Sequence, residues 1–381
     1  MKMEKSKTGK VSILKIQGRH DVCITMRILF LGIISLAMLG QAFALDTIPE
    51  KLSDWTEKGV VLQNSSGVAW ENKPGIAVSG ISKVGGIYYL HYLAGFNGCW
   101  DADGDVNHQS LGLATSTDGV NFTKFTGNPL LKPHDFVSVS SQEEGIRTAY
   151  IQYLPSKGKF YGYFGVESPG GSQTCNFGGG GTCGCNISVD SRVYGATSVD
   201  GKAWTVEGSV GGTYSSSGSE VYAAGWVYDG SQFGLYVTTA EGGQLKSASR
   251  GSNAWSLNEL GGISALDWGW SGLDVYLHDD NNTLTLIYNP QGGSHPGSSN
   301  DNLYFATTHL DDMRNIQNER VITTSGVLQN KILRDGNEWK WYYSDDPSWN
   351  NNVIRLRTHP IANSDNVPPE PPKNLNVAPI P

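Results

Sequence analysis

Residues 80–95 read GISKVGGIYYLHYLAG, and this stretch decides how the rest of the sequence is interpreted. An apolar run at residues 81–84 meets the pair Gly85-Gly86, and a second run, apolar and aromatic, follows at residues 87–93. The tight turns that join adjacent antiparallel strands need positive φ angles, which glycine adopts without steric cost. The stretch therefore predicts a β-hairpin with one strand on each side of the two glycines.

The same unit returns four more times along the chain. Each copy is an apolar strand, a turn rich in glycine, aspartate or asparagine, and an aromatic-rich strand; the copies occupy residues 150–164, 225–237, 275–288 and 332–343. Their starts lie roughly 50 to 75 residues apart, and repeats of this kind must pack on one another to bury their faces. The pattern predicts an all-β fold, a five-bladed β-propeller.

The repeats also predict the limits of the blades. We expect blades at residues 75–131, 143–208, 220–260, 274–321 and 327–358, with first-blade strands at 77–84, 87–95, 110–116 and 121–126. Residues 54–63 read as a lead-in strand that pairs with the last blade. A Ser-x-Asp-Gly motif at residues 116–119 and again at 198–201 predicts a tight turn with a structural role, followed by an aromatic residue that packs back onto the blade.

The composition agrees with this fold and excludes one class of partner. The 381 residues include 48 glycines and 39 aromatic residues (11 Trp, 17 Tyr and 11 Phe), and few segments have the periodicity of a helix. The net charge is −8, and the isoelectric point is about 5.5. Because no patch rich in lysine and arginine is present, we expect no nucleic-acid partner.

Both ends of the chain differ from its middle. Residues 26–44 read MRILFLGIISLAMLGQAFA, and the single arginine, the apolar run and the Ala-Phe-Ala end predict a secretory signal peptide. A transmembrane anchor is the alternative, but the unbroken apolar run is shorter than the roughly 20 residues that a bilayer span needs. The last fifteen residues, VPPEPPKNLNVAPIP, contain six prolines and predict an extended linker that resembles the entry to a fibronectin type III module.

These ends divide the chain into three predicted parts. A leader covers residues 1–44, the propeller covers 45–362, and the proline-rich linker covers 363–381. We expect a secreted or periplasmic protein that does not contact the membrane after the signal peptide is cleaved.

Cysteine usage fits an exported protein. Cleavage removes Cys23 with the leader and leaves four cysteines, Cys99, Cys175, Cys183 and Cys185. An even number of cysteines in an exported chain predicts disulfides, although a bridge between Cys183 and Cys185 would be strained. A zinc site is the alternative for these residues, against which the absence of paired C-x-x-C spacing argues.

The topology of a propeller predicts where a functional site lies. In a four-stranded antiparallel blade, the start of the innermost strand and the loop between the second and third strands are at the same end. These starts and loops from all blades therefore meet on one face, and ligands of radial folds bind where such loops converge. We expect the functional residues in these two places.

A resemblance to a known superfamily rests on the first blade. GIYYLHYLAG at residues 86–95 and LGLATSTDGVNFTKFTGNPLL at 111–131 resemble the first blade of the five-bladed propeller glycoside hydrolases, families 43, 32, 62, 68, 117 and 130. The likeness covers residues 70–358 and does not separate the families. It implies carboxylates at the inner-strand starts of successive blades, because glycoside hydrolysis needs one group to protonate the leaving oxygen and another as base or nucleophile. Val78 and Ser79 stand where these families show Asp-Pro in the first blade, which argues against hydrolysis of the family 43 type.

The second and third blades offer one glutamate each at the corresponding place. Residues 143–147 read EEGIR and have a faint likeness to the Glu-Asp-Pro-Arg motif of the family 130 mannoside phosphorylases. Glu144 is a candidate catalytic carboxylate, and Arg147 can bind a sugar hydroxyl or a phosphate; a solvated ion pair is the alternative. Glu220 precedes an apolar strand. Its distance in sequence from the following turn is nearly the distance that the general acid of the resembled family keeps. Partial burial at this place would raise the pKa of the Glu220 carboxyl into the range that suits a general acid. The alternative is a capping or structural glutamate.

The fourth blade offers Asp274, which follows Trp268 and Trp270. Tryptophans beside a carboxylate suit sugar recognition, because their rings pack on the apolar faces of pyranoses. Two core tryptophans are the alternative.

The loop after residue 95 contains a separate acidic motif. Asp101, Asp103 and Asp105 alternate along residues 99–108, and hard oxygen ligands in this spacing can bind Ca²⁺. An EF-hand is excluded because Val106 and Gly112 stand where its glycine and glutamate belong. The alternatives are a solvated acidic loop, or a replacement for the missing first-blade carboxylate.

Three further residues in face loops are candidates for binding. Trp100, next to the acidic motif, is a candidate for substrate binding. His108 and His295 can bind substrate or a metal.

The sequence thus predicts an exported glycosidase-like enzyme that cleaves a poly- or oligosaccharide, with no required cofactor and with Ca²⁺ as the candidate ion. The alternative is a non-catalytic carbohydrate-binding propeller, favoured by Val78 and Ser79. A polysaccharide lyase is a third class, for which no specific motif is present. The sugar, the linkage and the stereochemical course stay open, because the last depends on the separation of the carboxylates.

Overall fold

The structure is a computed structural model, and all of its described residues belong to the second of two compact units, Met1–Leu45 and Asp46–Pro381. The described residues are 48–49, 51–65, 67–71, 75–95, 109–136, 145–169, 189–209, 221–228, 233–239, 242–250, 255–262, 274–278, 282–288, 302–323, 327–345 and 353–361. The predicted leader and the proline-rich linker lie outside them. In the part that is described, no helix has the length and apolarity needed to cross a membrane.

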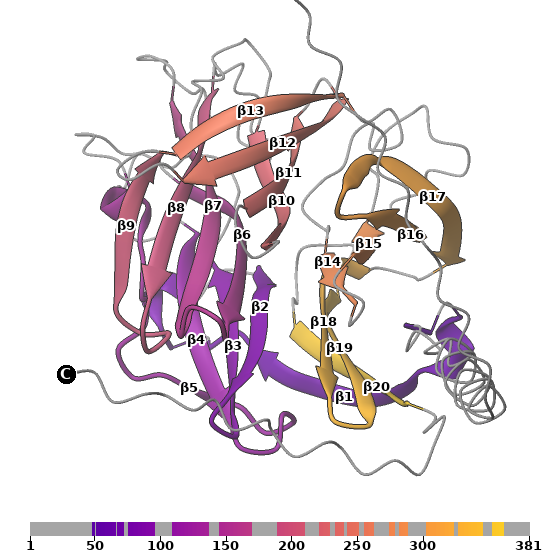
Figure 1. Cartoon of the computed structure of the whole chain (residues 1–381). Helices are drawn as coiled ribbons and strands as arrows, with labels where there is room; N and C mark the ends of the chain where they lie inside the picture. Colours follow the sequence, from indigo (N-terminus) through magenta and orange to yellow (C-terminus); the bar gives the residue numbers. More distant parts are fainter. Residues whose placement is uncertain are drawn as a thin grey trace, which may run out of the picture. The chain divides into compact units, whose positions relative to one another are not determined.

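The described residues form five antiparallel sheets of four strands each (Figure 1). The strands are β1 (Thr56–Gln63), β2 (Ile76–Val84), β3 (Ile87–Ala94), β4 (Ser110–Ser116), β5 (Thr123–Lys124), β6 (Gly145–Leu154), β7 (Lys159–Pro169), β8 (Val189–Ser198), β9 (Trp204–Ser209), β10 (Val221–Tyr228), β11 (Phe233–Thr239), β12 (Gly242–Arg250), β13 (Trp255–Gly262), β14 (Asp274–Leu277), β15 (Thr283–Tyr288), β16 (Asn302–His309), β17 (Asp312–Thr323), β18 (Val327–Asp335), β19 (Glu338–Asp345) and β20 (Val353–Pro360). Three short 3₁₀ helices, η1 (Leu52–Asp54), η2 (Ala69–Glu71) and η3 (Pro133–Asp135), complete the described elements.

Four sheets take their strands in chain order, and the fifth does not. Its order is β1-β20-β19-β18, so the lead-in strand β1 forms its outer edge by antiparallel pairing with β20. This pairing confirms the prediction made from residues 54–63. One edge strand of each sheet, here called its inner strand, is β2, β6, β10, β14 or β18. The inner strands contact one another in a closed cycle: β2 with β6, β6 with β10, β10 with β14, β14 with β18, and β18 with β2. The prediction of an all-β, propeller-like arrangement is therefore confirmed.

The first hairpin forms as its sequence predicts. Val84 pairs with Ile87, and Gly85 and Gly86 between them have φ angles of 57° and 83°. These positive values are open to glycine and strained for other residues. The predicted strands at residues 77–84 and 87–95 correspond to β2 and β3 with shifts of one residue.

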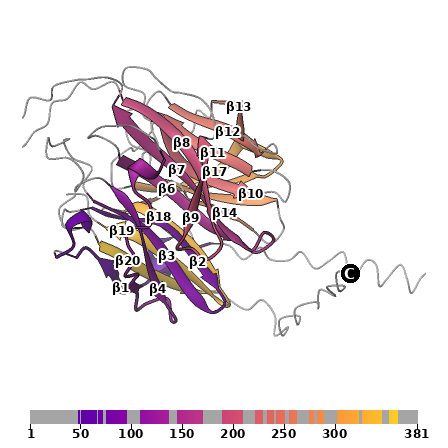
Figure 2. The same cartoon turned by 90° about the vertical axis from the view of Figure 1, so that its left-hand side faces the viewer.

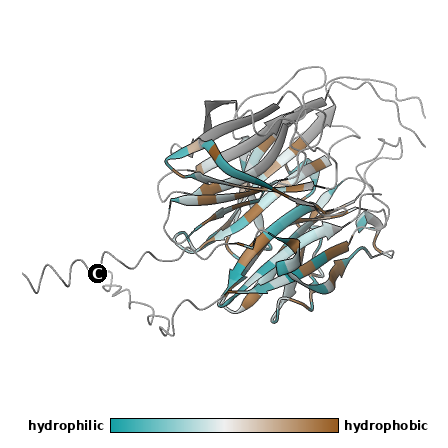
Figure 3. Cartoon of the chain, turned by 90° about the vertical axis from the view of Figure 1, so that its right-hand side faces the viewer, coloured by the Kyte–Doolittle hydropathy of each residue, from teal (hydrophilic) through white to brown (hydrophobic). Residues whose placement is uncertain are grey.

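Aromatic side chains fill the spaces between adjacent sheets. Trp226, Trp339 and Trp341 are among the largest fully buried side chains. Both polar and apolar residues occur along the strands in Figure 3. No residue of β3 or β4 is exposed, as expected for strands that pack on both faces. Figure 2 shows β2 and β3 beside β18 and β19, the pair of sheets at which the cycle closes.

A repeated joint links neighbouring sheets through the Ser-x-Asp-Gly turns. The Tyr342 hydroxyl donates to the Gly119 carbonyl at 2.7 Å, and its ring meets Phe122 edge-on. One sheet further on, His91 Nε2 donates to the Gly201 carbonyl at 2.9 Å, and its ring meets Trp204 edge-on. Both donors stand four residues after the start of the second strand of their sheets, β19 and β3. The predicted tight turns are confirmed, because the Asp118 and Asp200 carboxylates accept the backbone amides two and three residues further on. The aromatic residue after the turn contacts the neighbouring sheet in both cases, and Trp204 also contacts Phe164 of its own sheet.

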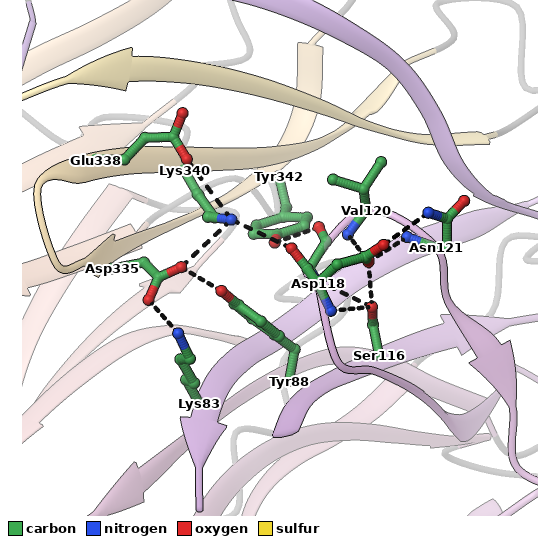
Figure 4. A network of polar contacts seen from close by, with 11 residues as sticks. Lys83, Tyr88, Ser116, Asp118, Val120, Asn121, Asp335, Glu338, Lys340 and Tyr342 are labelled. Carbon is green, nitrogen blue, oxygen red and sulfur yellow. Dashed lines mark hydrogen bonds and ion pairs between the residues drawn. The ribbon is translucent and has the colours of Figure 1, made fainter. Parts of the chain in front are cut away.

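The joint at Tyr342 is extended by a network of charged side chains (Figure 4). The carboxylate of Asp335 on β18 binds Lys83 Nζ of β2 at 2.6 Å and also accepts the Tyr88 hydroxyl of β3. Lys83 meets Oδ1 of this carboxylate, and Lys340 Nζ lies 3.3 Å from Oδ2, the oxygen that accepts the Tyr88 hydroxyl. The network ties the first sheet to the last at their hairpin ends.

A glycine is required where β2 passes β6. A Cβ atom on Gly80 would lie 2.3 Å from the carbonyl oxygen of Ile151 and 2.8 Å from its Cβ. We expect Gly80→Ala to lower the free energy of unfolding by about 3 kcal/mol, the upper end of the usual cost of overpacking, because the opposing backbone must move. Gly145→Ala is the matched control, since a Cβ on Gly145 meets nothing within 4 Å. Urea unfolding of both variants checks this, and equal stabilities would contradict the close packing of the two strands.

The joint at His91 makes stability depend on pH. Burial lowers the pKa of His91 from its ordinary 6.5 to about 4. Below pH 6.5 the imidazole of His91 therefore binds a proton in the unfolded chain but stays neutral in the folded protein. The free energy of unfolding falls as the pH decreases from 6.5 to about 4. The difference in pKa corresponds to roughly 3 kcal/mol.

Urea unfolding of the wild type and of His91→Gln, measured from pH 7 to pH 4, tests this prediction. Glutamine keeps an N–H donor but does not titrate, so the variant should lose less stability over that range. Parallel pH profiles for the two proteins would show that His91 does not titrate in this way.

Candidate active site

Most of the predicted site residues lie outside the described residues. They are Glu144, Glu220, Trp100, Trp268, Trp270, His108, His295, Asp101, Asp103, Asp105, Cys99, Cys175, Cys183 and Cys185. The structure does describe Asp274 and the backbone of Arg147. In sequence, Glu144 immediately precedes the first residue of β6 and Glu220 that of β10. Within the ranges that are described, no three His, Cys, Asp or Glu side chains form a group suited to a metal ion.

Asp274 is buried, with 3% of its surface exposed, and protein groups contact both of its carboxylate oxygens. The Tyr150 hydroxyl lies 2.7 Å from Oδ1, and the Ile332 amide donates to Oδ2 at 2.6 Å. The Val275 amide also donates to Oδ1, at 3.1 Å, and Lys331 Nζ lies 3.6 Å from the same oxygen. The side chain therefore connects its own strand, β14, to β6 and β18.

Tyr150 and Lys331 complete this cluster. Lys331 Nζ stands 4.0 Å from the centre of the Tyr150 ring, a cation–π contact. Burial lowers the pKa of Lys331, and the Asp274 carboxylate offsets part of that shift. Burial, together with the negative charge of Asp274, raises the pKa of Tyr150 well above its ordinary value, so the phenol keeps its proton and donates at neutral pH.

The cluster occupies equivalent positions of the inner strands. Four residues before the pair that closes each hairpin stand Gly80, Tyr150, Ala224, Asp274 and Lys331. Asp274 is the first residue of β14, but this alignment puts it level with residues in the middle of β6 and β18. Asp274 was predicted from the sequence as a site residue, and Tyr150 and Lys331 were not. Their equivalent distance from the hairpin turns is the signal in the sequence that points to them.

A cavity of about 290 Å³ borders the cluster. It is lined by the later halves of β2, β6 and β18 and by β14. Beside Asp274 and Lys331, its charged residues are Lys83 and Arg334. Three of the four groups that contact the Asp274 carboxylate meet Oδ1, and only the Ile332 amide donates to Oδ2.

Three of the inner strands share an irregularity nearer to their starts. The register shifts between Val78 and Gly80 in β2, between Ile146 and Thr148 in β6, and between Ala223 and Gly225 in β10. Bulges of this kind re-aim side chains and are common beside active sites. Arg147 is the bulged residue of β6, so the predicted substrate-binding arginine stands at such a place.

The first-blade position expected to hold a carboxylate is uncharged and buried. Val78 and Ser79 are 1% and 0% exposed. The Val78 amide donates to Ser344 Oγ of β19 at 3.0 Å. The described start of β2 therefore supplies no acid or base to a ligand.

Known proteins resemble this chain in structure but not in sequence. No family model and no curated protein matches the sequence. A candidate glycosidase from Bacteroides thetaiotaomicron superposes with a TM-score of 0.54 and 13% identity, over 81% of this chain and 98% of the other. A candidate glycoside hydrolase from Parabacteroides distasonis gives 0.52 and 14%, over 80% and 96%.

A third similar structure comes from work on the GH130 family of mannoside phosphorylases, which contains glycoside hydrolases that target β-1,2 mannosidic linkages in Candida mannan. It superposes with a TM-score of 0.50 and 13% identity, over 82% of this chain and 96% of the other. Identities this low show a shared fold alone. The predicted resemblance to propeller glycoside hydrolases is confirmed at the level of the fold, and no single family is distinguished.

Proposed function

We propose that the five sheets are the blades of one five-bladed β-propeller, and that the protein is an exported glycosidase-like enzyme that cleaves a glycosidic bond in a poly- or oligosaccharide. One observation carries this proposal. The adjacent inner strands β6 and β10 are joined by a bond from Trp226 Nε1 to the Tyr150 carbonyl at 3.0 Å, and a glutamate immediately precedes each strand in the sequence. Glycoside hydrolysis requires two carboxyl groups that flank the scissile bond, and in this proposal the two glutamates form that pair.

In this proposal Glu220 protonates the leaving oxygen and Glu144 is the base or nucleophile. Arg147, Trp100, Trp268, Trp270, His108 and His295 bind the sugar. Asp274 is the third carboxylate, and its bonds to Tyr150 and Ile332 favour a role in holding the strands. The similarity in fold to structures of glycoside hydrolases supports the class of reaction, although fold alone does not assign chemistry.

The acidic motif Asp101, Asp103 and Asp105 is proposed as a Ca²⁺ site. Its three carboxylates supply the hard oxygen ligands that this ion prefers. No step of the proposed cleavage depends on the ion, so its removal should affect stability or substrate affinity and leave the bond-breaking groups in place. Disulfides among Cys99, Cys175, Cys183 and Cys185 are part of the same proposal for an exported protein.

A non-catalytic carbohydrate-binding propeller is the second candidate, and a specific observation favours it. The inner-strand start of the first sheet presents the buried Val78 and Ser79 in place of an acid. If Glu144 and Glu220 were also inactive, the same face would bind sugar through aromatic and neutral polar groups.

An assay of the mature chain, from Leu45 onward, separates the two candidates. Release of reducing ends is measured on a panel of plant, algal and fungal polysaccharides that includes mannan, with and without EDTA, and binding is measured on the same panel. Turnover on any substrate supports the enzyme. Saturable binding without turnover on every substrate that binds would replace the enzyme with the carbohydrate-binding protein.

A further inference from the structure

The cavity of about 290 Å³ lies at the hairpin ends of the inner strands. Its lining residues on β2, β6, β14 and β18 stand at most four residues from the pairs that close the hairpins of these strands. Glu144 and Glu220 immediately precede the opposite ends of β6 and β10. A ligand in this cavity therefore occupies a different place from a substrate on the proposed catalytic face.

Exposure decreases from the mouth of the cavity to its floor. Lys83 is exposed, Gln152 and Arg334 are half-buried, and Tyr150 and Lys331 are 4% and 7% exposed. The cavity thus opens to solvent near the hairpin turns and ends at buried side chains. Its volume is just below the roughly 300 to 1,000 Å³ of most small-molecule sites, so it suits a small ligand.

Positive charges dominate the lining of the cavity. Of the described residues that line it, Lys83, Lys331 and Arg334 are cations, and Asp274 is the single carboxylate. The net charge of the whole chain is −8, so this surplus of positive charge is local. A cavity lined mainly by charges of one sign concentrates small ions of the opposite sign. The lining therefore favours an anion over a neutral molecule or a cation.

The ion pairs within the protein compensate these cations only in part. Lys331 Nζ lies 3.6 Å from Asp274 Oδ1, and burial lowers the pKa of Lys331 although this carboxylate is present. A further negative group beside the ammonium would stabilise its charged form. Lys83 Nζ lies 2.6 Å from Asp335, but its side chain is 38% exposed, and Lys340 meets the same carboxylate. Exposed ion pairs contribute little to stability, so Lys83 can exchange this partner for a ligand.

The donors of the lining match the oxygen atoms of an oxyanion. The planar guanidinium of Arg334 can bind two oxygens of one carboxylate or phosphate group, and the Lys331 ammonium carries three N–H donors. Ser82 Oγ accepts the Tyr153 amide at 3.1 Å, which leaves its O–H to donate. Donors on several strands around one cavity are suited to a ligand that presents several acceptor oxygens.

We propose that this cavity binds a small oxyanion, with Lys331 at its floor and Arg334 and Lys83 nearer to its mouth. The ligand is phosphate, sulfate or the carboxylate of an acidic sugar, which all present the same kind of oxygen atom to these donors. The inference does not rest on the proposed function. The oxyanion site stands whether or not the protein cleaves a glycosidic bond.

Isothermal titration calorimetry of the full chain is the first test, in a Tris buffer of low ionic strength that supplies no oxyanion. The probes are inorganic phosphate, sulfate and glucuronate, with glucose as the uncharged counterpart of glucuronate. At least one of the three anions should bind saturably, and glucose should bind more weakly than glucuronate. Tighter binding of phosphate or sulfate identifies a free inorganic ion as the ligand, and tighter binding of glucuronate identifies an acidic sugar. No saturable binding of any anion up to about 10 mM, ten times the Kd of a millimolar site, would overturn the proposal.

Arg334→Gln assigns the bound anion to the cavity. The change removes the guanidinium and should raise the Kd by about 10- to 100-fold, the usual effect of losing hydrogen bonds to a charged group. Arg334→Lys keeps the charge without the planar fork, so its Kd should lie between the two. Arg320→Gln is the matched control, because Arg320 is exposed on β17 and outside the cavity lining. Equal Kd values for Arg334→Gln and Arg320→Gln would place the anion elsewhere and end the proposal.

Gln152→Lys separates the charge of the site from general destabilisation. The variant adds a cation to the half-buried part of the lining, so the anion should bind about threefold or more tightly than in the wild type. A loss of structure cannot produce such a gain, and near-UV circular dichroism checks that the variant is folded. Unchanged or weaker binding by the folded variant would contradict an anion in this cavity. An inactive protein that passes these tests would end the enzyme proposal and keep the oxyanion site.

Discussion

Replacing Glu220 with glutamine is expected to lower kcat by about 10²–10⁴-fold, the usual contribution of a positioned general acid. Glutamine has nearly the same size and can keep hydrogen bonds, but it has no acidic proton to give to the leaving oxygen. KM should change little, because the substrate-binding groups are kept. Initial rates of reducing-end release on the substrate identified for the wild type measure both constants.

Glu338→Gln is the control for the Glu220 variant. Glu338 lies at the hairpin end of β19, where its carboxylate is 3.6 Å from Lys340 Nζ, and it belongs to none of the proposed catalytic or binding groups. Its loss should leave kcat unchanged. If Glu220→Gln and Glu338→Gln had the same kcat, Glu220 would not be the acid, and the pair at the starts of β6 and β10 would have to be abandoned.

The fold could be predicted from the sequence because its signals are local. Gly85 and Gly86 have the positive φ angles of a two-residue turn, and the unit of strand, turn and aromatic strand returns four more times along the chain. The pairing of β1 with β20 was predictable for a related reason, since a strand-like segment before the first complete repeat has only the last sheet left to join.

The arrangement at Asp274 could not be predicted in the same way. The sequence marks the residue as a carboxylate near two tryptophans, but its partners Tyr150 and Lys331 are far away in the chain. Which residues meet across the inner strands depends on how the five hairpins align in height, and that alignment is set by loop lengths and bulges. The predicted residues in the face loops stay predictions, because they lie outside the described part of the chain.

The second large effect concerns stability, and it follows from the pairing of two buried charges. Lys331 and Asp274 are 7% and 3% exposed. Lys331→Met keeps most of the volume of the side chain but leaves the Asp274 carboxylate buried without its cation. We expect the free energy of unfolding to fall by about 3–5 kcal/mol, the usual result of removing one partner of a buried ion pair.

Urea unfolding at pH 7 of the wild type, Lys331→Met, Asp274→Asn and the double variant completes a thermodynamic cycle. The double variant should be more stable than Lys331→Met, because removing both charges also removes the unpaired one, and replacing a buried pair with neutral groups of similar size is often close to neutral. Additive losses in the cycle would mean that the two charges do not interact. The Asp274 carboxylate also accepts the Ile332 amide and the Tyr150 hydroxyl, and so it connects β6 to β18. Non-additive losses in the cycle would show that the charge of Lys331 stabilises this carboxylate.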